Sequence, residues 1–119
     1  MSLASNIAIA TVALIHVYIL VLEMFLWDKP AGLRAFGQTQ AAASASKTLA
    51  ANQGLYNGFL AAGLCWSLTQ GAQGFRTAIF FLTCVAIAGI YGAITASRKI
   101  LFVQTVPAVI ALVLVHFPK

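Results

Sequence analysis

Four apolar stretches, each about twenty residues long, dominate the chain and limit what it can fold into. They cover about residues 3–27, 49–69, 76–97 and 100–117, and charged residues fall almost entirely between or beside them. About twenty apolar residues in a helix are enough to cross the hydrocarbon core of a bilayer. Because 61% of the 119 residues are hydrophobic and only 8% are charged, one soluble core could not bury this apolar surface. The sequence predicts an all-α polytopic membrane protein, a single domain formed by a bundle of four transmembrane helices.

The connections between these stretches differ in length. The first is long and starts with Asp28, Lys29 and Pro30, which is a typical helix stop. We expect its Ala-rich part to form a short helix at the membrane surface, with Leu33 and Phe36 dipping into the bilayer. The last connection, Ser97 to Lys99, is barely a turn and predicts a tight hairpin of the last two helices.

The basic residues indicate orientation rather than recognition of an anionic partner. Five of them lie in the first and third connections (Lys29, Arg34, Lys47, Arg98 and Lys99), and two lie on the opposite side (Arg76 and Lys119). By the positive-inside rule, both termini face away from the cytoplasm. The net charge of +5 does not indicate nucleic-acid binding, because no basic stripe alternates with stacking aromatics. The predicted location is the bacterial cytoplasmic (inner) membrane, with membrane lipids as partners.

Sequence signals for signal-peptide cleavage and for cofactor binding are weak. No Lys or Arg precedes the first apolar run, and that run is too long for the core of a signal peptide, so we expect it to be a retained helix. Cys65 and Cys84 have no metal-ligand spacing and are interpreted as small buried residues. No metal site and no cofactor are predicted.

Polar side chains gather in one predicted layer of the membrane, toward the cytoplasmic ends of all four helices. Glu23 and His16 are the candidate catalytic residues, because both can exchange protons and their seven-residue spacing places them on one helix face. An acid inside a membrane is a functional candidate by default, although Glu23 could instead reach the headgroups or pair with a nearby base. His16 could also be a neutral imidazole bonded to a helix backbone. The candidate ligand-binding residues are Asn52, Gln53, Tyr56, Asn57, Tyr91 and Gln104.

The second helix is expected to combine a polar face with a groove. Asn52, Gln53, Tyr56 and Asn57 span an arc of about 140° on a helical wheel, and we expect this face to point into a shared interior. Gly54 and Gly58 form a GxxxG groove beside it. We expect the groove to face another helix, most plainly the one over 76–97 with its own small residues, or a second copy of the chain. A homo-oligomer through Gly54 and Gly58 is therefore one prediction.

Three classes of function remain open on these residues. The first is a polar intramembrane pocket, open to the cytoplasmic side, that binds or processes a small or lipid-like ligand. The second is a proton-coupled small transporter, which the nearly apolar outer half of the helices disfavours. The third is a structural or assembly subunit in which the amides act only as bonds between helices, an interpretation that suits Gln104 well. Whether the chain is an enzyme stays open.

Four blocks carry a resemblance to a known family: HVYILVLEMFLW from His16, LAANQGLYNGFLAAGL from Leu49, AGIYGAITA from Ala88 and VQTVPAVIAL from Val103. They resemble the domain-of-unknown-function 1304 family of small bacterial membrane proteins, over nearly the whole chain. NQGLYNG is the most specific block. The resemblance implies a four-helical integral membrane protein and carries no assigned reaction.

Overall fold

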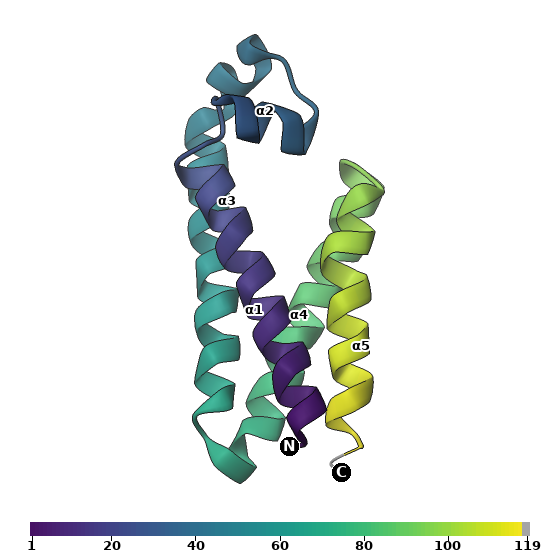
Figure 1. The fold of residues 1–119 in the computed structure, drawn as a ribbon. Coiled ribbons are helices and arrows are strands. Elements are labelled where there is room, and N and C mark those ends of the chain that lie inside the picture. The colour runs from purple at the N-terminus through teal and green to yellow at the C-terminus, as the bar shows by residue number, and fades with distance from the viewer. Residues whose placement is uncertain (118–119) are drawn as a thin grey trace. The chain divides into compact units, whose positions relative to one another are not determined.

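The computed structural model describes residues 1–117, and these residues form helices without any strand (Figure 1). The long helices are α1 (Leu3–Met24), α3 (Gln40–Leu68) and α4 (Gly74–Thr95). Shorter elements are α2 (Pro30–Phe36), a 3₁₀ turn η1 (Gly71–Gln73), a π-helical segment η2 (Leu101–Thr105) and α5 (Val106–Val115). The predicted all-α class is confirmed.

Two of the described helical segments are long and apolar enough to cross a membrane, judged by length and composition. They are Leu3–Met24 and Gly71–Thr95, and a shorter apolar helix covers Leu101–Val115. This suggests an association with membranes. The four crossings expected from the sequence stay a prediction.

The second helix begins about nine residues earlier than predicted. Thr39 accounts for this start, because its hydroxyl accepts a hydrogen bond from the backbone N–H of Ala42 at 3.1 Å. The Ala-rich residues 41–46 therefore continue α3 and do not form a separate surface helix, which corrects the expectation for this part of the loop. The short helix α2 lies just before them and contains Leu33 and Phe36.

The chain folds into two compact units, Met1–Ile15 with residues 60–117, and His16–Phe59. The first is called the hairpin unit, because α4 packs there against η2 and α5. Its core holds Ile9, Val12, Leu64, Leu82 and Val85, all essentially inaccessible to solvent, with Ala108 and Ala111 from α5 packed among them. The second is called the Glu23 unit, and it holds the end of α1, all of α2 and the first part of α3.

A π-helix opens the last helix, two residues before a proline. Pro107 has no backbone N–H, and its ring would crowd the carbonyl four residues earlier. The N–H of Val106 accordingly bonds to the carbonyl of Leu101, five residues back. This widened turn places Thr105 so that its hydroxyl donates to the carbonyl of Ala86 on α4, at 3.0 Å.

Candidate functional site

A carboxyl–amide pair joins α1 to α3 inside the Glu23 unit. Glu23 lies on the last turn of α1, and its Oε1 accepts a hydrogen bond from Nδ2 of Asn57 on α3, at 2.6 Å. Both side chains are buried, with Glu23 only 2% exposed and Asn57 7%. The prediction that Glu23 points inward and reaches one of the polar residues is confirmed. An amide can donate to a carboxylate or accept from a carboxylic acid, so the pair suits either protonation state.

Gly54 and Gly58 let the two helices approach closely enough for this short amide to reach Glu23. A Cβ at Gly54 would lie 3.0 Å from Glu23 Cβ and 2.6 Å from Met24 Cγ, and one at Gly58 would lie 2.6 Å from Leu20 Cδ1. The groove thus faces α1. The prediction that it faces another helix is confirmed, and the choice of the helix over 76–97 is wrong. Large side chains of α1 fill the groove, whereas the prediction paired it with a helix that has small residues of its own.

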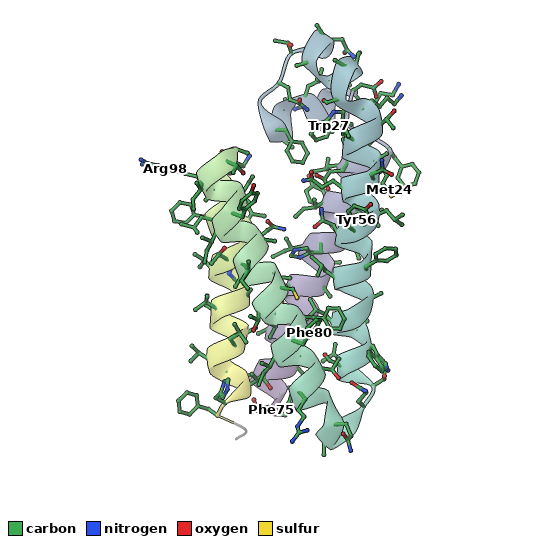
Figure 2. All side chains as sticks on the ribbon, turned by 180° about the vertical axis from the view of Figure 1, so that it is seen from behind. Met24, Trp27, Tyr56, Phe75, Phe80 and Arg98 are labelled. Atoms are coloured by element: carbon green, nitrogen blue, oxygen red, sulfur yellow. The ribbon has the colours of Figure 1, made fainter. Side chains whose placement is uncertain are left out.

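The remaining polar residues of α3 do not share this buried position. Asn52, Gln53 and Tyr56 are all exposed, and Tyr56 is 60% accessible. Figure 2 labels Tyr56 on α3. At 100° per residue, Tyr56 lies 100° and Asn52 lies 140° around the helix from Asn57. Because Asn57 faces α1, Tyr56 and Asn52 point away from α1. Of the expected polar face, the structure buries Asn57 alone. Ligand binding by the other three stays a prediction.

His16 also belongs to the Glu23 unit and is completely buried. It precedes Glu23 on α1 by seven residues, about 10 Å along the axis at 1.5 Å per residue. At this separation a proton could not pass directly between the two side chains. A catalytic role of either residue stays a prediction.

Tyr91 and Gln104 belong to the hairpin unit, so their expected grouping with Glu23 also stays a prediction. Tyr91 is 70% exposed on α4, and Gln104 is buried in the π-helical segment. The next residue, Thr105, was not among the predicted site residues, although it is buried and contacts α4. Its backbone N lies 2.8 Å from where a Cβ at Gly89 would stand. The Pro107 two residues later was the available signal for an irregular turn here.

A second set of bonds ties the residues that follow α1 to α3, beyond the Glu23–Asn57 pair. Trp27 Nε1 donates to Ser46 Oγ at 3.1 Å, and Lys47 Nζ lies 3.1 Å from Asp28 Oδ2. The hydrogen bond from Lys47 holds the pKa of the Asp28 carboxyl below its usual value. In the sequence Lys47 is one of the basic residues that indicate orientation, and nothing in the local pattern marks its pairing with Asp28 across nineteen residues.

Comparison with known proteins finds relatives without a known activity. The model of a family described as "Protein of unknown function (DUF1304)" matches residues 10–116. An uncharacterised protein, YpaA of Lactococcus lactis subsp. lactis (strain IL1403), is 30% identical over 115 residues, which cover 95% of this chain and 97% of YpaA. No solved structure matches the chain.

Proposed function

Because this chain belongs to the DUF1304 family of proteins of unknown function, we propose from its own geometry that it is a polytopic membrane protein with a ligand site at Glu23. In this proposal α1, α3, α4 and the η2–α5 helix cross the inner membrane, with both termini away from the cytoplasm. The site opens toward the cytoplasmic side and takes a small or lipid-like ligand.

The surface of the helices supports the membrane placement. Large hydrophobic side chains are exposed on all four of these helices, including Leu14 on α1, Phe59 on α3 and Ile110 on α5. Phe80 on α4, labelled in Figure 2, is another. Soluble proteins rarely expose so much contiguous apolar surface, whereas lipid tails are its natural neighbours. The 29 residues of α3 would rise about 43 Å, so its polar first turns would project from the bilayer.

The observation that carries the ligand site is the buried carboxyl of Glu23. An acid in an apolar helix costs about 2.5–3.5 kcal/mol by insertion scales, so such residues tend to persist where they act on a ligand or a proton. Asn57 satisfies one oxygen of the carboxyl. Asn52, Gln53 and Tyr56 are exposed on the same stretch of α3, where they are accessible to an amphiphile arriving from the surrounding leaflet. Asn52 and Tyr56 point away from α1, and Gln53, about 40° around the helix from Asn57, leaves closest to the Glu23 face.

The test compares ligands that copurify with the wild-type chain, with Glu23→Gln and with Asp28→Asn. Glutamine keeps an oxygen that can accept from Asn57, so we expect Glu23→Gln to keep the fold and its unfolding temperature. We expect mass spectrometry to detect a bound ligand on the wild type and on Asp28→Asn, and a loss of at least about tenfold on Glu23→Gln, which corresponds to 1.4 kcal/mol. Asp28 is a matched control because the chain has only these two acidic side chains.

A hydrophobic carbodiimide gives an independent readout. Dicyclohexylcarbodiimide reacts with protonated carboxyls in apolar surroundings, so we expect it to modify Glu23, to leave Asp28 unmodified, and to react less when the ligand is bound. Identical ligand content in a folded Glu23→Gln protein would contradict the proposal.

A structural role is the second candidate, and one observation favours it. The Glu23–Asn57 bond joins α1 directly to α3 beside the glycine groove, as a bond that only fixes helix packing would. On this hypothesis Glu23→Gln, which preserves the bond, changes neither ligand content nor stability. The same experiment therefore separates the two candidates.

A further inference from the structure

The segment between α1 and α3 forms a fixed surface rather than a loose connection. We call residues 27–36 the cap segment. Within it, Gly32 packs so tightly on the carbonyls of Leu26 and Trp27 that any Cβ would overlap them. The rings of Trp27 and Phe36 lie 4.7 Å apart, and the indole bonds to Ser46 on α3. Gly37 then ends α2 with a φ of 61°, a left-handed conformation that suits glycine. These contacts hold α2 across the end of the α1–α3 pair.

The basic side chains on and beside this surface outnumber its acidic ones. Asp28 is the acid of the cap segment; Lys47 pairs with it, and the adjacent Lys29 also acts on its charge. Lys29 and Arg34 are both exposed, and the remaining acid of the chain, Glu23, is buried against Asn57. Arg34 lies two residues, or about 200°, around α2 from Gly32, so its side chain leaves from the face opposite the packed one. The cap segment thus carries two exposed basic side chains within the same ten residues as the paired rings of Trp27 and Phe36. Phe36, four residues after Gly32, leaves α2 on nearly the same side as Gly32, and Arg34 leaves it on the opposite side.

We propose that the cap segment binds the headgroup of an anionic phospholipid, with Lys29 and Arg34 on the phosphate and Trp27 and Phe36 at the level of the glycerol backbone. Trp is enriched at membrane interfaces because its ring is apolar and its N–H is polar. Arginine and lysine bind phosphate oxygens through charge-assisted hydrogen bonds. A bilayer lipid fits better than a soluble phosphate because Phe36, in the same segment as the two basic residues, is 38% exposed and suits an apolar neighbour. The proposal rests on the membrane placement above and is independent of the ligand at Glu23.

The chain contains its own reporter for this site. It has two tryptophans, Trp27 in the cap segment and Trp66 near the other end of α3. Replacing Trp66 with Phe leaves Trp27 as the fluorophore, and replacing Trp27 with Phe leaves Trp66 as the matched control. Each protein is reconstituted into vesicles of phosphatidylcholine and phosphatidylglycerol, with one or the other lipid brominated to quench nearby tryptophan.

At Trp27 we expect brominated phosphatidylglycerol to bind more tightly than phosphatidylcholine, by about fivefold for each basic side chain. The double substitution Lys29→Gln with Arg34→Gln should bring this preference close to one, with no change at Trp66. Arg76→Gln, which removes one exposed charge from α4, should leave Trp27 unaffected.

Equal quenching by the two lipids at Trp27 of the otherwise unchanged chain would overturn the proposal. So would a preference that survives the double substitution, or one that falls equally at Trp66. If the membrane placement itself is wrong, neither tryptophan is quenched by either lipid, and that outcome is distinct from a bilayer protein without lipid preference. Competition by inorganic phosphate at low millimolar concentration would also contradict the choice of a lipid.

Discussion

Replacing Asn57 with leucine should show how strongly the chain depends on the Glu23–Asn57 bond. Leucine has no donor, so it leaves the buried Glu23 carboxyl without the 2.6 Å hydrogen bond it receives from Asn57. Removing one partner of a buried polar pair costs about 1–3 kcal/mol, because the remaining group keeps its desolvation penalty. We expect Asn57→Leu to lower the free energy of unfolding by about 2 kcal/mol.

A double-mutant cycle separates the bond from other effects of the substitution. Glu23→Leu with Asn57→Leu removes both partners, and such replacements can be nearly neutral. The two single losses should therefore exceed the loss of the double variant by at least 1 kcal/mol. The assay is reversible unfolding in mixed micelles, followed by circular dichroism. Asn52→Leu is the matched control, because Asn52 is an exposed amide on the same helix and its loss should stay within about 0.5 kcal/mol.

The coupling energy between Glu23 and Asn57, measured by this cycle, decides the interpretation. Hydrogen bonds between membrane helices are worth about 0.6 kcal/mol on average. A coupling at or below that value would mean that Asn57 does no more than an average polar contact, and the reasoning from the buried carboxyl would be refuted. A large coupling together with an unaffected Asn52→Leu variant would identify this pair as the polar centre of the Glu23 unit.

Two further predictions concern packing and topology. Gly89→Ala should destabilise the chain by about 1–3 kcal/mol, because the added Cβ meets the Thr105 backbone. Gly58→Ala should cost less, because its Cβ meets only the end of the Leu20 side chain. Equal losses of stability in thermal unfolding would contradict this prediction. In a chain whose two cysteines are replaced by alanine, a single cysteine at 73 should react with an impermeant reagent on intact cells and one at 40 should not; the reverse result would invert the proposed orientation.

The sequence predicted the helical class and the inward position of Glu23, because both follow from composition and from the cost of burying an acid. It also indicated that Gly54 and Gly58 face another helix. The start of α3 was misplaced because the residues after Thr39 are alanines alternating with polar residues rather than a run of large apolar ones. Hydropathy ignores such residues, while the Thr39 cap and the helix propensity of alanine extend the helix through them.

The partner of each glycine groove depends on chain connectivity and side-chain size, which a search for matching small residues does not capture. In the Glu23 unit, Leu20 and Met24 from α1 fill the groove at Gly54 and Gly58. In the hairpin unit, Thr105 meets Gly89, and Ile100 lies 3.0 Å from a Cβ at Gly92. In the Glu23 unit the groove is filled by the helix before the long connection, and in the hairpin unit by the segment after the short one. In both units the side chains that fill the groove are larger than the small residues expected there.

This pairing gives each unit its own polar bond beside its own groove. Glu23 accepts from Asn57 next to Gly54, and Thr105 donates to Ala86 three residues before Gly89. Close approach and polar bonding reinforce each other, because glycine brings the backbones near enough for short side chains to reach across. The two bonds differ in chemistry, however. A hydroxyl on a carbonyl is neutral and serves packing alone, whereas a carboxyl on an amide can lose or gain a proton, and for that reason the ligand hypothesis rests on Glu23 and not on Thr105.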